Sequence, residues 1–118
     1  MFRVGLVGFG FMGKMHAQCY KASGKAAVAA IADIDPKKRT DGRAKYGCET
    51  YDSLDSLLAG TQVDIVDICL PTYLHEEGVL KAAKAGKHIL CEKPMALSVE
   101  SCNRMIQAVR KAGVTMMI

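Results

Sequence analysis

The stretch Val4-Gly5-Leu6-Val7-Gly8-Phe9-Gly10-Phe11-Met12-Gly13 decides the fold. An apolar run leads directly into three glycines with the spacing G-x-G-x-x-G, and a helical pattern follows. The first glycine allows a sharp turn, the second lets the backbone approach a pyrophosphate, and the third lets the helix pack close to the strand. Strand, turn and helix together predict a dinucleotide-binding βαβ unit.

We expect this unit to bind an anion at the amino end of the helix that starts near Phe11 or Met12. Its first backbone N–H groups have no intrahelical acceptor and its dipole is positive there, so a pyrophosphate can bind without Lys14. We therefore expect contacts between the cofactor and residues of the glycine loop and helix start. The expected residues are Gly8, Gly10, Phe11, Met12 and Gly13.

Apolar spacing along the same helix places Met12, Met15 and Cys19 on one face. We expect this face to pack against the sheet. His16 and Gln18 fall on other faces and are expected to be solvated or at the edge of the core.

The choice of cofactor is predicted by Asp33, which ends the next apolar run twenty positions after Gly13. A carboxylate there can accept hydrogen bonds from the ribose hydroxyls of NAD. The 2′-phosphate of NADP would meet a like charge, and at about 4 Å with an effective dielectric near 20 the repulsion is of order 4 kcal/mol. NAD is thus expected in preference to NADP. The basic run 37–39 could reach a 2′-phosphate, or it is simply an exposed helix start.

Composition predicts one domain over residues 1–118, because half of the residues are apolar and the chain is too short for two ordinary domains. The net charge of +4 and the lack of an interleaved basic and aromatic surface argue against a nucleic-acid partner. No apolar run is long enough to span a membrane. Five cysteines without a CxxC pair predict free thiols in a reducing cytoplasm, most of them buried, with Cys69 and Cys91 in the core.

Beyond the glycine loop, the chain alternates strand and helix patterns. Predicted strands are 3–7, 28–33, 48–51, 64–69, 88–91 and 114–118. Predicted helices are 12–23, 36–46, 53–59, 72–85 and 99–112, with Thr72 and Ser98 as caps of the last two. In the last helix, Val99, Cys102, Ile106 and Val109 share a face. The order predicts an α/β fold of the Rossmann type, a doubly wound, mainly parallel six-stranded sheet with helices on both faces.

Two further motifs follow strands whose carboxyl ends should face one crevice. Pro71-Thr72-Tyr73-Leu74-His75 follows the fourth predicted strand, and Glu92-Lys93-Pro94 follows the fifth. With the glycine loop and Asp33, these motifs make essentially the whole chain resemble the amino-terminal NAD-binding domain of the glucose-fructose oxidoreductase, inositol dehydrogenase and MocA family.

The resemblance implies roles for matching residues. Lys93 would be catalytic, reaching the nicotinamide and the substrate hydroxyl. Glu92 would hold the nicotinamide ribose, and Pro94 would follow a cis peptide bond, which is accessible to X–Pro bonds. Pro71, Thr72 and His75 would lie beside the nicotinamide, although the family more often has asparagine where Thr72 stands.

No metal is expected near His75. The sequence has no second histidine at helical ligand spacing from it. The two following glutamates are explained by the helix dipole.

The family's activity implies NAD-dependent oxidation of a hydroxyl on a sugar, cyclitol or related polyol. Family members continue into a second domain that binds the substrate and builds the oligomer. Residues 1–118 are therefore expected to be the cofactor half, inactive by itself and prone to self-association as a possible homo-oligomer. An alternative is a regulatory or scaffold module that senses NAD without catalysis; the Glu92-Lys93-Pro94 motif favours the enzyme.

Overall fold

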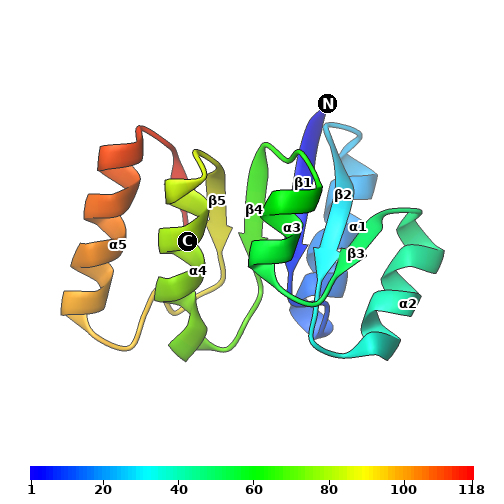
Figure 1. The fold of residues 1–118 in the computed structure, drawn as a ribbon, viewed down its shortest axis with the longest axis horizontal. Helices are drawn as coiled ribbons and strands as arrows, with labels where there is room; N and C mark the ends of the chain where they lie inside the picture. The colour runs from blue at the N-terminus through cyan, green and yellow to red at the C-terminus, as the bar shows by residue number, and fades with distance from the viewer.

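Six parallel strands form the centre of the molecule, which the computed structural model describes over residues 1–118 (Figure 1). The strands are β1 (Phe2–Val7), β2 (Ala26–Ala32), β3 (Glu49–Tyr51), β4 (Ile65–Ile68), β5 (His88–Cys91) and β6 (Met116–Met117). Their order in the sheet is β3-β2-β1-β4-β5-β6, and every neighbouring pair is parallel. The direction of winding reverses between β1 and β4, so a ligand crevice is expected at the carboxyl ends of these two strands. The predicted α/β doubly wound fold is confirmed.

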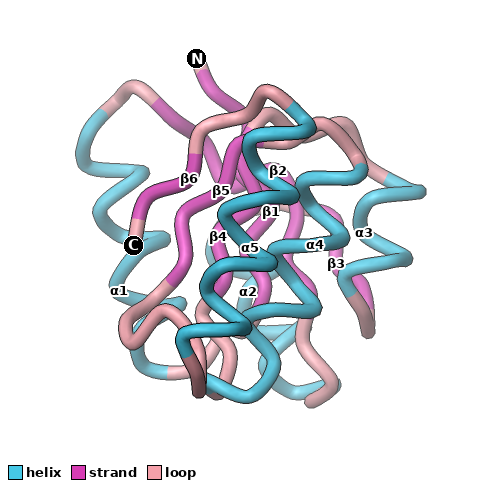
Figure 2. Tube along the Cα trace, turned by 90° about the vertical axis from the view of Figure 1, so that its left-hand side faces the viewer, coloured by secondary structure: helices cyan, strands magenta, loops and turns pink.

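Helices cover both faces of the sheet (Figure 2). They are α1 (Phe11–Ser23), α2 (Pro36–Tyr46), α3 (Leu54–Gly60), α4 (His75–Lys84) and α5 (Val99–Ala112). Buried side chains form a larger cluster between the sheet and α3, α4 and α5, and a smaller cluster on the α1 and α2 side. Side chains alternate between the two sides along each strand. None of the helices combines the length and apolarity needed to cross a bilayer.

The packing face of α1 differs from the prediction. Met12, Met15 and Cys19 are exposed, whereas Gly13 and Ala17 are buried. The reason is the close approach of the helix to the strand: a Cβ on Gly13 would collide with the carbonyl group of Gly8. The helix therefore touches the sheet along its smallest residues, and the larger side chains of the predicted face point outward.

The last two helices also depart from the predicted details. Thr72 is not the cap of α4; it begins a short 3₁₀ helix, η1 (Thr72–Leu74), and α4 starts one turn later at His75. Ser98 does cap α5, accepting a hydrogen bond from the Ser101 N–H. The buried side of α5 is centred on Met105, and Val99 is 72% exposed because it lies in the first turn, beyond the edge of the core.

Cysteine burial is less complete than expected. All five cysteines are unpaired. Only Cys48 and Cys91 are buried, while Cys69 and Cys102 are partly exposed and Cys19 lies on the outer face of α1. The prediction of a buried majority was wrong because Cys19 and Cys102 lie on helix faces that are not fully covered, and Cys69 lies in the loop after β4.

Candidate functional site

The glycine loop joins β1 to α1 with the geometry that the G-x-G-x-x-G pattern predicts. Gly8 has φ +92°, and a Cβ there would lie 2.9 Å from the carbonyl carbon of Cys69, so only glycine fits. At Gly10, by contrast, an added Cβ would face open space. The first hydrogen bond of α1 runs from the Lys14 N–H to the Gly10 carbonyl at 2.9 Å. The three preceding N–H groups, on Phe11, Met12 and Gly13, therefore have no intrahelical acceptor.

Asp33 follows β2 and lies beside this loop, half-buried. One carboxylate oxygen accepts a hydrogen bond from the Phe9 N–H at 2.8 Å, and the other accepts one from the Asp35 N–H at 2.9 Å. A carboxylate offers about four acceptor positions, so roughly two remain for a ligand. The side chain thus holds the glycine loop in place and still has acceptor capacity for ribose hydroxyls.

The three basic residues after Asp33 have different surroundings. The Arg39 guanidinium donates to the carbonyl oxygens of Asp33 and Ile34, at 2.8 and 3.2 Å, and so closes the turn after β2. The Lys38 Nζ lies 4.0 Å from the position that a Cβ on Gly10 would take. Lys38 is therefore the cation of this group that faces the glycine loop.

A cleft of about 280 Å³ opens next to Asp33, between the carboxyl ends of β1, β2 and β4 and the helices α3 and α4. Its walls are largely apolar, with Leu54, Leu70 and Leu74 among the lining residues. An apolar wall beside a carboxylate with remaining acceptor capacity suits a flat ring joined to a polar sugar.

The second half of the predicted site lies at the carboxyl ends of β4 and β5. Because these strands are neighbours in the sheet, the loops that carry Pro71 and Glu92 also lie side by side. The Lys93–Pro94 peptide bond is cis, as the resemblance implies. Lys93 is exposed and has no hydrogen bond or ion pair in this structure, so its amine is available to a ligand.

His75 requires a correction, because its ring has no exposed surface from which to contact a cofactor. Its Nδ1 lies 2.9 Å from the carbonyl oxygen of Pro94, and its Nε2 lies 2.8 Å from the carbonyl oxygen of Leu70. The ring therefore ties the loop after β4 to the loop after β5.

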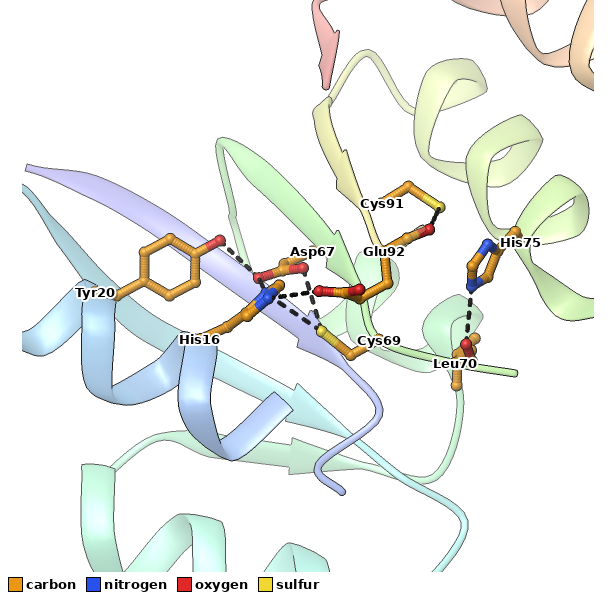
Figure 3. A network of polar contacts seen from close by, with 8 residues as sticks. All are labelled: His16, Tyr20, Asp67, Cys69, Leu70, His75, Cys91 and Glu92. Atoms are coloured by element: carbon orange, nitrogen blue, oxygen red, sulfur yellow. Dashed lines mark hydrogen bonds and ion pairs between the residues drawn. The ribbon is translucent and has the colours of Figure 1, made fainter. Parts of the chain in front are cut away.

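Sequence reasoning missed a polar network beneath these loops (Figure 3). Asp67, in the middle of β4, is completely buried. Its Oδ2 accepts a hydrogen bond from the Tyr20 hydroxyl at 2.6 Å and lies 2.8 Å from Nδ1 of His16. The other ring nitrogen of His16 lies 2.9 Å from Oε1 of Glu92. A charged residue inside an apolar strand run was the one sequence signal that pointed to this network.

Burial and the Asp67 carboxylate also determine the state of the nearby thiols. Burial, followed by the charge of Asp67, raises the pKa of Cys91 to about 12 and raises the pKa of Cys69 in the same direction. Both groups are therefore neutral thiols at neutral pH and poor nucleophiles.

A metal could in principle draw ligands from His16, Asp67 and Cys69, whose ligand atoms all lie within 4.8 Å of one another. The three groups are instead joined to one another by hydrogen bonds, with the Cys69 Sγ 3.4 Å from both the His16 Nδ1 and an Asp67 oxygen. The geometry is that of a hydrogen-bonded cluster.

Comparisons with known proteins give the family. Residues 2–118 match the family described as an oxidoreductase family with an NAD-binding Rossmann fold. The 2,7-anhydro-N-acetylneuraminate hydratase of Escherichia coli K12 is 39% identical over 117 residues, covering 99% of this chain and 31% of that protein. The myo-inositol 2-dehydrogenase of Thermotoga maritima is 36% identical over 113 residues, covering 95% of this chain and 34% of that protein.

Solved structures agree with the sequence comparisons. The WlbA dehydrogenase from Bordetella pertussis, in complex with NADH and UDP-GlcNAcA, is 34% identical, with a TM-score of 0.94 over 98% of this chain and 36% of that one. The chain spans about a third of the length of the curated relatives that it matches. By this evidence, the chain belongs to the glucose-fructose oxidoreductase, inositol dehydrogenase and MocA oxidoreductase family and has its NAD-binding Rossmann fold.

Proposed function

We propose that this chain is the cofactor-binding half of an oxidoreductase that transfers a hydride between nicotinamide and a hydroxyl of a sugar, cyclitol or related polyol. The observation that carries the proposal is the meeting of three elements at one edge of the sheet. These are the glycine loop, the Asp33 carboxylate and the Glu92-Lys93-Pro94 loop, which follow β1, β2 and β5. The relatives named for inositol and levoglucosan dehydrogenases support this substrate class.

The residues present fit a dinucleotide. The open space at Gly10 and the unpaired N–H groups of Phe11, Met12 and Gly13 form a cradle for a pyrophosphate. Asp33 would accept hydrogen bonds from the adenosine ribose, and the neighbouring cleft would receive the adenine. Pro71 and Thr72 would border the nicotinamide. When bound, NAD supplies the hydride acceptor.

Lys93 would act on the proton rather than on the hydride. Its exposed amine has no partner in the chain, so it would be free to hydrogen-bond a substrate hydroxyl and to take up the proton that this hydroxyl loses as the hydride goes to NAD. Glu92, next to it in the chain, would accept hydrogen bonds from the nicotinamide ribose. The pair would thereby hold substrate and cofactor on the same side of the crevice.

The cofactor preference would come from Asp33, with NAD favoured over NADP. Lys38 faces the glycine loop and would contribute to pyrophosphate binding. Arg39 is engaged with backbone carbonyls and would not be free for a 2′-phosphate.

Calorimetric titration of the chain with NADH and with NADPH tests the cofactor part of the proposal. We expect saturable binding of NADH, weaker binding of NADPH, and no binding of ATP at the same concentration. A chain that binds neither reduced cofactor would refute the proposal.

The catalytic part is tested by following nicotinamide absorbance with NAD and a panel of inositols and sugars. The chain has one lysine at the substrate side and would need further groups to hold a polyol, so we expect cofactor binding without turnover. Turnover by a verified monomer of this length would show that Lys93 and its neighbours suffice. A longer protein that includes this chain should turn over a polyol. Loss of this turnover in Lys93→Met, with turnover retained in the control Lys87→Met, would support the role of Lys93. It would also argue against a purely regulatory module.

A further inference from the structure

A carboxylate without exposed surface lies in the middle of a central strand. Asp67 is flanked in β4 by Val66 and Ile68, which belong to the apolar cluster on the α3, α4 and α5 side. Alternation along the strand turns Asp67 to the opposite side, under α1. Burying a charge there is costly unless it is paired and hydrogen-bonded. Asp67 is paired: Tyr20 donates to it and His16 contacts it, both from α1.

His16 connects this buried carboxylate to the crevice. Its ring reaches inward to Asp67 with Nδ1 and outward to Glu92 with Nε2, at 2.8 and 2.9 Å (Figure 3). Each ring nitrogen thus has one carboxylate oxygen within hydrogen-bond distance. The side chains of His16 and Glu92 are each 18% exposed, so the outer contact lies near the surface of the crevice while the inner contact is sealed.

We propose that His16 is a positioning residue: anchored by Asp67 and Tyr20, it fixes the Glu92 carboxylate and thereby couples the glycine-loop helix to the Glu92-Lys93-Pro94 loop. His16 stands three residues after Gly13, on the helix whose amino end forms the pyrophosphate cradle. The same helix therefore sets both the phosphate contacts and the orientation of Glu92. The functional consequence rests on the proposed function, because Glu92 matters to a ligand only if the nicotinamide ribose binds there.

The buried end of the network explains why the outer end is rigid. Without Asp67, the imidazole would be held by one exposed acid and could rotate about its side-chain bonds. With Asp67 and Tyr20 in place, Nδ1 has a fixed acceptor, and the direction of the opposite nitrogen follows from the planarity of the ring. Holding a ligand-binding group in one orientation in advance lowers the ordering cost of binding.

Two amide substitutions separate the contacts of His16. In His16→Gln, the side-chain amide nitrogen can occupy the place of Nε2 and still donate to Glu92. In His16→Asn, it can occupy only the place of Nδ1 and contact Asp67. Gln18→Asn, on the exposed face of the same helix, is the matched control for helix propensity. We expect NADH binding about tenfold weaker in His16→Asn and about threefold weaker in His16→Gln, which keeps the Glu92 contact but gives up the Asp67 anchor; Gln18→Asn should stay within about twofold of the wild type.

Glu92→Gln completes a double-mutant cycle. If His16 acts through Glu92, the effects of His16→Asn and Glu92→Gln on NADH affinity should not add. The double variant should then bind NADH no more weakly than whichever single variant has the lower affinity. Additive losses, or equal losses in His16→Gln and His16→Asn, would overturn the proposal, because a purely structural effect on the helix would not distinguish the two amides. Thermal melting of each variant checks that all of them are folded.

A measurement on the chain without NADH tests the positioning role of His16 separately from cofactor binding. The ¹³C chemical shift of the Glu92 carboxyl carbon, measured in the free chain, should move toward that of a solvated glutamate in His16→Asn and should move less in His16→Gln. That pattern in a chain that binds no NADH would sustain the positioning role and refute the proposed function. An unchanged Glu92 signal in folded His16→Asn would overturn the positioning role, whatever the cofactor affinity.

Discussion

Substitution of Gly10 should separate cofactor binding from folding. Gly10 precedes α1 with φ −81° and ψ −156°, a backbone conformation open to any residue, so a side chain adds no strain. A Cβ there would have only the Lys38 Nζ within reach, at 4.0 Å, and that amine is the flexible end of its side chain. Gly10→Val should therefore leave the free energy of unfolding within about 0.5 kcal/mol of the wild type.

The loss of binding should be much larger, because the valine branches would occupy the cradle above the start of α1. A hydrogen bond to a charged group contributes about 1.5–3 kcal/mol, and displacement of the pyrophosphate from two backbone donors would remove about 3–6 kcal/mol. This corresponds to an affinity for NADH more than a hundredfold lower.

Gly13→Ala is the matched contrast, with a smaller change and the opposite expected outcome. Its Cβ would lie 3.0 Å from the carbonyl carbon of Gly8 and closer still to the oxygen, and neither backbone can yield by changing a rotamer. Overpacking of this kind costs about 3 kcal/mol or more, equivalent to a melting temperature roughly 10 °C lower.

Circular dichroism melting and calorimetric NADH titration of the two variants give the test. We expect a folded Gly10→Val protein without binding and a destabilised Gly13→Ala protein. A Gly10→Val variant that binds NADH as the wild type does would place the phosphates elsewhere. A Gly13→Ala variant with unchanged melting temperature would show that α1 does not need its close approach to β1.

Three further predictions concern charge and thiol chemistry. Asp33→Ser should narrow the preference for NADH over NADPH, and an unchanged affinity ratio would assign the preference to other residues. Iodoacetamide at neutral pH should modify the exposed Cys19 long before Cys91, whose burial raises its pKa to about 12; mass spectrometry of the peptides reads the order. The Arg104 hydrogen bonds lower the pKa of Glu76 below its unfolded value, so this contribution to stability is present above the unfolded pKa and is lost as pH falls through the folded pKa. Glu76→Gln should therefore melt below the wild type at neutral pH and level with it in strong acid.

Local signals predicted much of the fold. The bounds of α2 and β5 agree with the predicted ranges, and Ser98 and Gly113 bound α5 as expected. The glycine loop has the predicted turn at Gly8 and the predicted close approach at Gly13. These features depend on residues within a few positions of one another, whose backbone preferences and capping groups act without the rest of the chain.

Local patterns failed where the distance between elements decides the outcome. Periodicity on α1 favoured the Met12 and Met15 face, but the helix lies so near β1 that the small residues Gly13 and Ala17 form its buried side and the two methionines point outward. Similarly, threonine is a residue type that often caps helices, yet Thr72 does not cap α4. The 3₁₀ helix η1 lies between them, so α4 begins too far from Thr72.

The amino-acid sequence by itself determined the βαβ order, the glycine turn and the positions of Asp33 and Lys93 at strand ends. Only the tertiary structure decided that His16, Asp67 and Glu92 form one network, because Asp67 lies 51 positions and Glu92 lies 76 positions after His16 in the chain. Their contact requires β4 to lie between β1 and β5 in the sheet and the His16 side chain on α1 to reach both Asp67 and Glu92. No local propensity encodes that arrangement, since it follows from burying both faces of the sheet at once.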